Sequence, residues 1–109
     1  MNNPQGSLFN GDETQLCFES LSLKSICPTL WLMLGRAMYY DFGVGHVMQP
    51  EFPNFDNLKF TVVAIESYMR ALSEIGHGMS CHLIVQVPNS VADDLVKTLP
   101  ETFFLRAGI

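Results

Sequence analysis

The chain has 109 residues, of which 48% are hydrophobic and 16% are charged, and it carries a formal net charge of −5 at pH 7. This length corresponds to one domain. The six lysine and arginine residues are too few and too scattered for the basic stripe that nucleic-acid binding usually needs, and they argue equally against binding to an anionic membrane. The acidic balance instead favours docking on another protein that has a basic surface.

Three cysteines, Cys17, Cys27 and Cys81, are widely spaced and odd in number, whereas a disulfide framework uses an even and denser set. We therefore expect buried free thiols in a reducing compartment. The polar segment 1–13 has neither the basic start nor the apolar stretch of a signal peptide. It is predicted to be a flexible arm, followed by a single domain over residues 14–109 of a cytoplasmic protein.

The first element expected in chain order covers residues 15–24. Leu16 and Phe18 alternate, as do Leu21 and Leu23, but the phase slips between these two pairs. The pattern indicates a strand with an irregularity, although a short helix at the same place fits it almost as well.

Residues 29–40 are apolar on nearly every side, and Arg36 is their only charge. Pro28 occupies a position typical of the first residue of a helix. We interpret the segment as a helix that is buried on several sides or packs against another chain. The following stretch, residues 42–55, contains two prolines and three phenylalanines and is predicted to be a loop pinned by its aromatic side chains.

The strongest periodicity in the chain comes next. Apolar residues recur at steps of four, three, four and three, as expected for one face of an α-helix; they are Leu58, Val62, Ile65, Met69 and Leu72. Asp56 fits an N-cap, and Gly76 fits a C-terminal stop. The alternative is a strand over residues 60–65, where β-branched residues cluster, but the longer periodicity favours the helix.

Residues 81–88 form a pattern typical of a strand in the interior of a sheet, with a continuous apolar centre. A short helix capped by Asn89 or Ser90 is expected up to about residue 98, and residues 102–105 fit a last strand. A strand, a helix and a strand in succession favour a parallel crossover. The sequence therefore predicts an α+β fold, a small single domain in which two main helices and a short third helix pack on a small mixed β-sheet.

One dense cluster of reactive side chains occurs, at His77, Cys81 and His82. Adjacent residues of a strand point to opposite faces, so at most one of Cys81 and His82 can join His77 in a zinc site, which needs about four ligands. A nucleophilic Cys81 would need a nearby base and an electropositive setting, and the sequence shows neither. We expect no metal site and no catalytic residue here, and no motif in the chain predicts a cofactor.

Aromatic residues with polar tips gather after the long apolar segment. Tyr39, Tyr40, Asp41 and His46 lie close together in the sequence, and such side chains form either an interface hot spot or the lining of a ligand pocket. Together with Trp31, they are the candidate binding or interface residues.

The lack of a catalytic signature, the scarcity of charge and the apolar segment 29–40 favour a non-enzymatic protein-interaction module. It would be an acidic adaptor, inhibitor or immunity-type protein that docks on a partner and forms a homodimer. The alternative is a small-molecule-binding protein or small enzyme with an aromatic pocket near Tyr39, Tyr40 and His46, to which Cys81 would contribute. Mimicry of nucleic acid is a third hypothesis, which requires the acidic residues to gather on one face.

Overall fold

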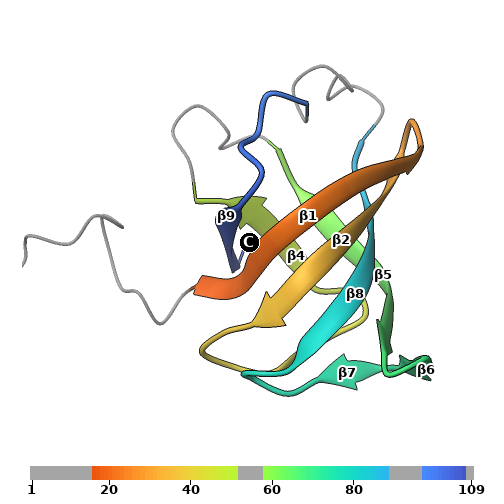
Figure 1. Cartoon of the computed structure of the whole chain (residues 1–109), viewed down its shortest axis with the longest axis vertical. Coiled ribbons are helices and arrows are strands. Elements are labelled where there is room, and N and C mark those ends of the chain that lie inside the picture. Colours follow the sequence, from red (N-terminus) through yellow and green to blue (C-terminus); the bar gives the residue numbers. More distant parts are fainter. Residues whose placement is uncertain (1–15, 52–57, 89–96, 108–109) are drawn as a thin grey trace, which may run out of the picture.

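The computed structural model describes residues 16–51, 58–88 and 97–107 (Figure 1). Its strands are β1 (Leu16–Cys27), β2 (Leu30–Ala37), β3 (Phe42–Gly43), β4 (Val47–Pro50), β5 (Phe60–Ser67), β6 (Arg70–Leu72), β7 (Glu74–Ile75), β8 (Ser80–Gln86) and β9 (Phe103–Ala107). Residues 16–51 and 58–88 contain no helix, so the predicted α+β fold with two main helices is wrong. The predicted arm over residues 1–13 and residues 89–96 of the predicted third helix lie outside the described residues.

Six strands close into a barrel in the order β4-β9-β1-β2-β8-β5, because β5 also pairs with β4. β6 extends the sheet beyond β5, outside the closed ring, and β3 and β7 form a separate two-stranded pair. Every pairing is antiparallel, so the predicted parallel crossover and mixed sheet are also wrong. Figure 1 shows β1, β2 and β8 crossing the front of the barrel, with β4 and β5 behind them.

Strand β2 replaces the helix predicted over residues 29–40. Trp31, Met33 and Ala37 are buried in the barrel, while the intervening Leu32 and Leu34 lie on the outer face. Both faces of this strand are apolar, so the sequence lacks the alternation that normally marks a half-buried strand. A strand of this kind cannot be distinguished from a buried helix by its hydrophobic pattern alone.

The helix predicted over residues 58–72 is instead the hairpin of β5 and β6. Val62 and Ile65 are both buried although they are three residues apart, because a register shift between Val62 and Ala64 places an extra residue in β5. Leu72 then pairs with Ile65 across the hairpin. A bulge and a turn thus give a pair of strands the apolar spacing of a helix. The cluster of β-branched residues over residues 60–65 correctly indicated a strand.

Strand β1 carries an irregularity, a register shift against β2 between Ser20 and Ser22, so the strand alternative is confirmed there. The two strands approach each other closely at Gly35 of β2. A Cβ atom on Gly35 would lie 2.0 Å from the carbonyl oxygen of Glu19 and 2.7 Å from the ring of Phe18. Glycine is therefore the one residue that allows β1 and β2 to pair at this point.

The later strands follow the sequence more closely. β8 lies between β2 and β5 in the sheet, which confirms the predicted interior strand, and β9 confirms the last one. The loop predicted over residues 42–55 is wrong in part, because β3 and β4 lie within it. Residues 52–57 of that stretch lie outside the described residues.

The barrel interior is filled with apolar side chains. Each of the six barrel strands contributes a large side chain that is less than 2% exposed; these include Phe18, Met33, Met48, Phe60, Leu83 and Leu105. An eight-stranded barrel has an interior just wide enough for side chains to fill, so a ring of six is narrower still. In the part of the chain that the structure describes, no helix has the length and apolar character needed to cross a membrane.

Candidate functional site

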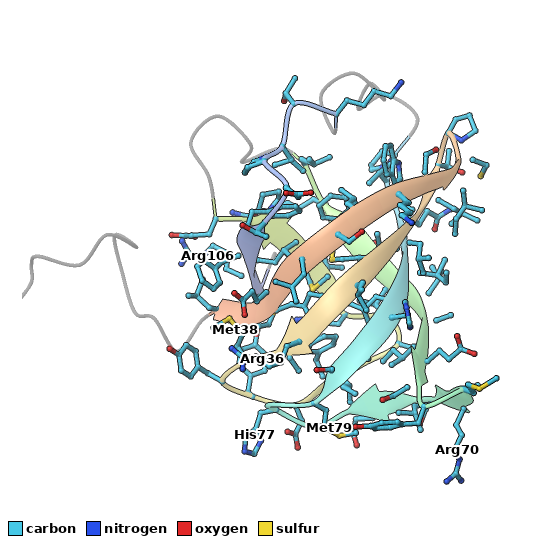
Figure 2. All side chains as sticks on the ribbon, in the orientation of Figure 1. Arg36, Met38, Arg70, His77, Met79 and Arg106 are labelled. Atoms are coloured by element: carbon cyan, nitrogen blue, oxygen red, sulfur yellow. The ribbon has the colours of Figure 1, made fainter. Side chains whose placement is uncertain are left out.

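The hairpin of β5 and β6 ends in a turn that presents two large apolar side chains to solvent. Tyr68 is 88% exposed and Met69 is 93% exposed. Figure 2 shows the neighbouring Arg70 extending away from the barrel at the lower right. We call residues 67–70 the hairpin tip.

The backbone of the hairpin tip is unfavourable for the residues that occupy it. Tyr68 and Met69 have φ angles of 52° and 64°, in the left-handed region. Two-residue hairpin turns of this kind are usually made by Asn-Gly, because a side chain makes the left-handed region less favourable by about 1–2 kcal/mol per residue. The two residues therefore lower the stability of the turn and expose apolar surface at the same time.

The strands below the hairpin tip hold it in position. Ser67 donates a hydrogen bond from Oγ to the carbonyl oxygen of Ser80 at 2.9 Å, and it pairs with Arg70 in the antiparallel ladder. The exposed Glu66 precedes the tip, so charges of both signs flank the apolar pair. A preformed apolar pair with a charged rim has the composition of an interface hot spot, where Tyr, Met and Arg are enriched.

The structure brings together two of the candidate residues that the sequence indicated. The rings of Tyr40 and His46 meet edge to face with their centroids 6.0 Å apart, and His46 also stacks on Phe42 with a centroid separation of 4.9 Å. Trp31 is buried inside the barrel at 4% exposure, whereas Tyr39 is 51% exposed.

The polar atoms of the Tyr40–His46 pair are shielded from solvent, and within the described residues neither the Tyr40 hydroxyl nor His46 Nε2 has an oxygen or nitrogen partner. The hydroxyl lies against the thiol of Cys17. Burial raises the pKa of Cys17 to about 12, and burial together with Cys17 raises the pKa of Tyr40. Burial also lowers the pKa of His46, so its imidazole is neutral at pH 7. In this conformation a ligand cannot reach these atoms from solvent.

Asp41 contacts His77, which lies in the turn between β7 and β8. Oδ1 of Asp41 accepts a hydrogen bond from the backbone N–H of His77 at 2.7 Å and lies 2.9 Å from His77 Nδ1. These hydrogen bonds hold the pKa of the Asp41 carboxyl below its usual range. The contact connects two loops at the same end of the barrel, and both side chains are more than half exposed.

The cluster of His77, Cys81 and His82 divides as strand geometry predicts. Cys81 is buried inside the barrel and His82 is exposed on its outer face. Among the described residues, no group of three or more His, Cys, Asp and Glu side chains could hold a metal ion. All three cysteines are free thiols; Cys17 and Cys81 are buried as predicted, but Cys27 is partly exposed.

A pocket of about 280 Å³ lies beside β1 and β9. Acidic and aromatic residues are prominent among the described residues of its lining, which include Glu19, Glu51, Pro100, Thr102, Phe103 and Phe104. Ion pairs of 3.1 Å join Glu19 to Arg36 and Glu51 to Arg106, and Figure 2 shows both arginines on the left half of the molecule. We call this site the Glu19–Glu51 pocket.

Comparisons with known proteins leave the function to be argued from these features. No protein-family model matches the chain, and no curated protein matches it significantly.

Sequence reasoning missed the hairpin tip because Met69 fell on the apolar face of the expected helix. A local signal would have revealed the turn. The cluster of β-branched residues ends before Ser67, and polar residues resume at Arg70. The two residues between Ser67 and Arg70 are the number that a two-residue hairpin turn requires. The pair Tyr-Met lacks the Asn-Gly chemistry by which such turns are recognised.

Proposed function

We propose that the protein is a non-enzymatic docking module whose hairpin tip binds a recess on a partner protein. The observation that supports this function is the pair of Tyr68 and Met69, which is almost fully exposed in a backbone conformation unfavourable to both residues. The two side chains stabilise neither the core nor the turn. Burying it against a partner would contribute about 25 cal/mol for each Å² of apolar surface removed from water.

The apolar segment 29–40 supports docking less than its sequence suggests. Trp31, Met33 and Ala37 fill the barrel, so much of the apolar surface of this segment belongs to the core. Leu34 remains 38% exposed on the outer face. We therefore propose that the partner contacts the hairpin tip rather than segment 29–40. The cytoplasmic location and the self-association expected from the sequence remain part of the proposal.

Charge sets the kind of partner surface that the tip would meet. The net charge of −5 favours approach to a partner with a basic surface. Arg70 adds one positive charge at the tip itself, and a guanidinium binds carboxylates with strong, charge-assisted hydrogen bonds. We therefore propose a partner recess that is apolar at its centre and carries a carboxylate at its edge.

Site-specific photocrosslinking tests this function. A benzoylphenylalanine at position 69 is expected to form one dominant adduct with a partner protein in the native cell, identified by mass spectrometry. The same group at position 26 is the matched control, because Ile26 is an apolar residue, 54% exposed, at a different hairpin. Tyr68→Ala is expected to weaken binding of the identified partner about 30-fold, the effect of losing a hot-spot residue. The same adducts from both positions, or binding unchanged by Tyr68→Ala, would refute the proposal.

A further inference from the structure

The methionines outside the barrel core differ widely in exposure. Met69, at the hairpin tip, is 93% exposed, whereas Met79 is 39% exposed and Met38 is partly buried. The sulfur of Met79 also packs near Gly76, where an added Cβ atom would lie 3.4 Å from it. An oxidant in solution must reach the sulfur in order to react. Among the methionines that the structure describes, Met69 is therefore the one most open to oxidation.

Oxidation converts the thioether from an apolar group into a polar one. Hydrogen peroxide transfers one oxygen atom to the sulfur, so that an S–O bond forms while the O–O bond of the peroxide breaks. The sulfur loses two electrons, and the remaining hydroxide takes the proton of the transferred oxygen and leaves as water. The product, methionine sulfoxide, is returned to methionine by two reductases, one for each epimer. The change is therefore reversible.

The fold of the free chain does not depend on the Met69 thioether. The side chain lies in water, so a sulfoxide oxygen at this position stays hydrated, and oxidation leaves the φ angle of 64° as it is. Met33 and Met48 differ, because both are fully buried in the barrel and a sulfoxide there would place a polar oxygen in the core. Oxidation of Met69 can thus act on docking without unfolding the barrel.

We propose that Met69 is a modification site, at which oxidation by a peroxide reversibly switches off docking of the hairpin tip. In the reduced chain, the thioether enters the apolar recess of the partner beside Tyr68. In the oxidised chain, the sulfoxide must give up its water on entering that recess, and burial of an unpaired polar group weakens binding roughly 10-fold or more. This inference rests on the proposed function, because it describes the regulation of the same tip.

Two substitutions at position 69 test the role of the sulfur. Met69→Leu keeps an apolar side chain of similar volume without the sulfur, so it is expected to dock as the wild type does and to be insensitive to peroxide. It retains the partly exposed thiol of Cys27 and therefore also controls for oxidation of cysteine. Met69→Gln bears an oxygen on its δ atom, as the sulfoxide does, and is expected to bind roughly 10-fold more weakly, or worse, without any peroxide.

Peptide mapping after brief treatment with hydrogen peroxide gives the order of oxidation. Met69 is expected to react at least about twofold faster than Met79, because it is the more exposed. Titration with the partner protein identified by crosslinking from position 69 then measures the affinity of the treated chain. The treated wild type is expected to bind roughly 10-fold more weakly or worse, to regain its affinity after incubation with both reductases, and to keep its free energy of unfolding in urea.

Four results would overturn this inference and leave the docking function standing: oxidation of Met79 before Met69, unchanged affinity of the oxidised wild type, wild-type affinity of Met69→Gln, or loss of stability on oxidation of Met69. Loss of affinity in peroxide-treated Met69→Leu would place the sensitive group elsewhere in the chain and would overturn it as well. A chain that forms no specific adduct from position 69 would refute the proposed function, and the regulation with it.

Discussion

The three cysteines differ in reactivity because their surroundings differ. Burial raises the pKa of Cys17 to about 12 and that of Cys81 to about 11. Cys27 lies at the end of β1, where hydrogen bonds from the backbone N–H and then the side chain of Thr29 lower its pKa; its Sγ is 3.7 Å from Thr29 Oγ1. The thiolate is the reacting species, so Cys27 should react at a pH where the other two stay protonated.

We expect iodoacetamide to alkylate Cys27 alone in the folded protein near pH 8. Because its pKa is lowered, the rate rises with pH and reaches its plateau at a lower pH than that of an unperturbed cysteine. Thr29→Val removes the hydroxyl, retains the backbone N–H, and is expected to slow the reaction at neutral pH roughly twofold, the low end for loss of a hydrogen bond. Peptide mapping by mass spectrometry identifies the modified thiol. Alkylation of Cys17 or Cys81 without denaturant would contradict their burial.

Single residues show what local sequence can predict about a site. Tyr40 and His46 are close in the sequence, and a turn at Gly45, whose φ is 96°, lies between β3 and β4 and directly precedes His46. Their proximity was therefore a reasonable expectation. The shielding of their polar atoms depends in part on Cys17, which comes from the start of β1, and no local pattern connects that strand with this turn.

Among the elements, the β5–β6 hairpin combines low stability with exposed apolar side chains. We expect the tip variant, Tyr68→Asn with Met69→Gly, to raise the free energy of unfolding by about 1 kcal/mol, because asparagine and glycine adopt the left-handed region more readily. Urea unfolding measures the change. Ile26→Asn alters a residue without positive φ and is expected to change stability by less than about 0.5 kcal/mol. Lower stability of the tip variant would indicate that Tyr68 and Met69 support the fold rather than a partner.

The sequence predicts a strand best where an apolar run is short. In β8 the apolar run from Leu83 to Val85 lies between the polar His82 and Gln86, so its length favoured a strand. In β2 the outward positions hold Leu32 and Leu34, so the apolar run is longer and resembles a buried helix. In β5 the bulge near Val62 shifts the alternation itself, which no count of apolar residues at fixed spacing can anticipate.

At the scale of the whole molecule, the barrel closes through one short strand. β4 pairs with β5 through the two residue pairs Val47–Thr61 and Met48–Phe60, and Met48 also lies opposite Ala107 of β9. The β4–β9 pairing joins the middle of the chain to its end, so it is a long-range pairing that no local pattern predicts. The fully buried Met48 therefore belongs to both seams of the ring.

We expect Met48→Ala to lower the free energy of unfolding by about 2–5 kcal/mol, as for other large-to-small changes in a core, which is much of the stability of a small domain. Met79→Ala removes the same atoms from a side chain that is 39% exposed and is expected to cost less than about 1 kcal/mol; urea unfolding compares the two. Equal effects would contradict the role of β4 in closing the ring.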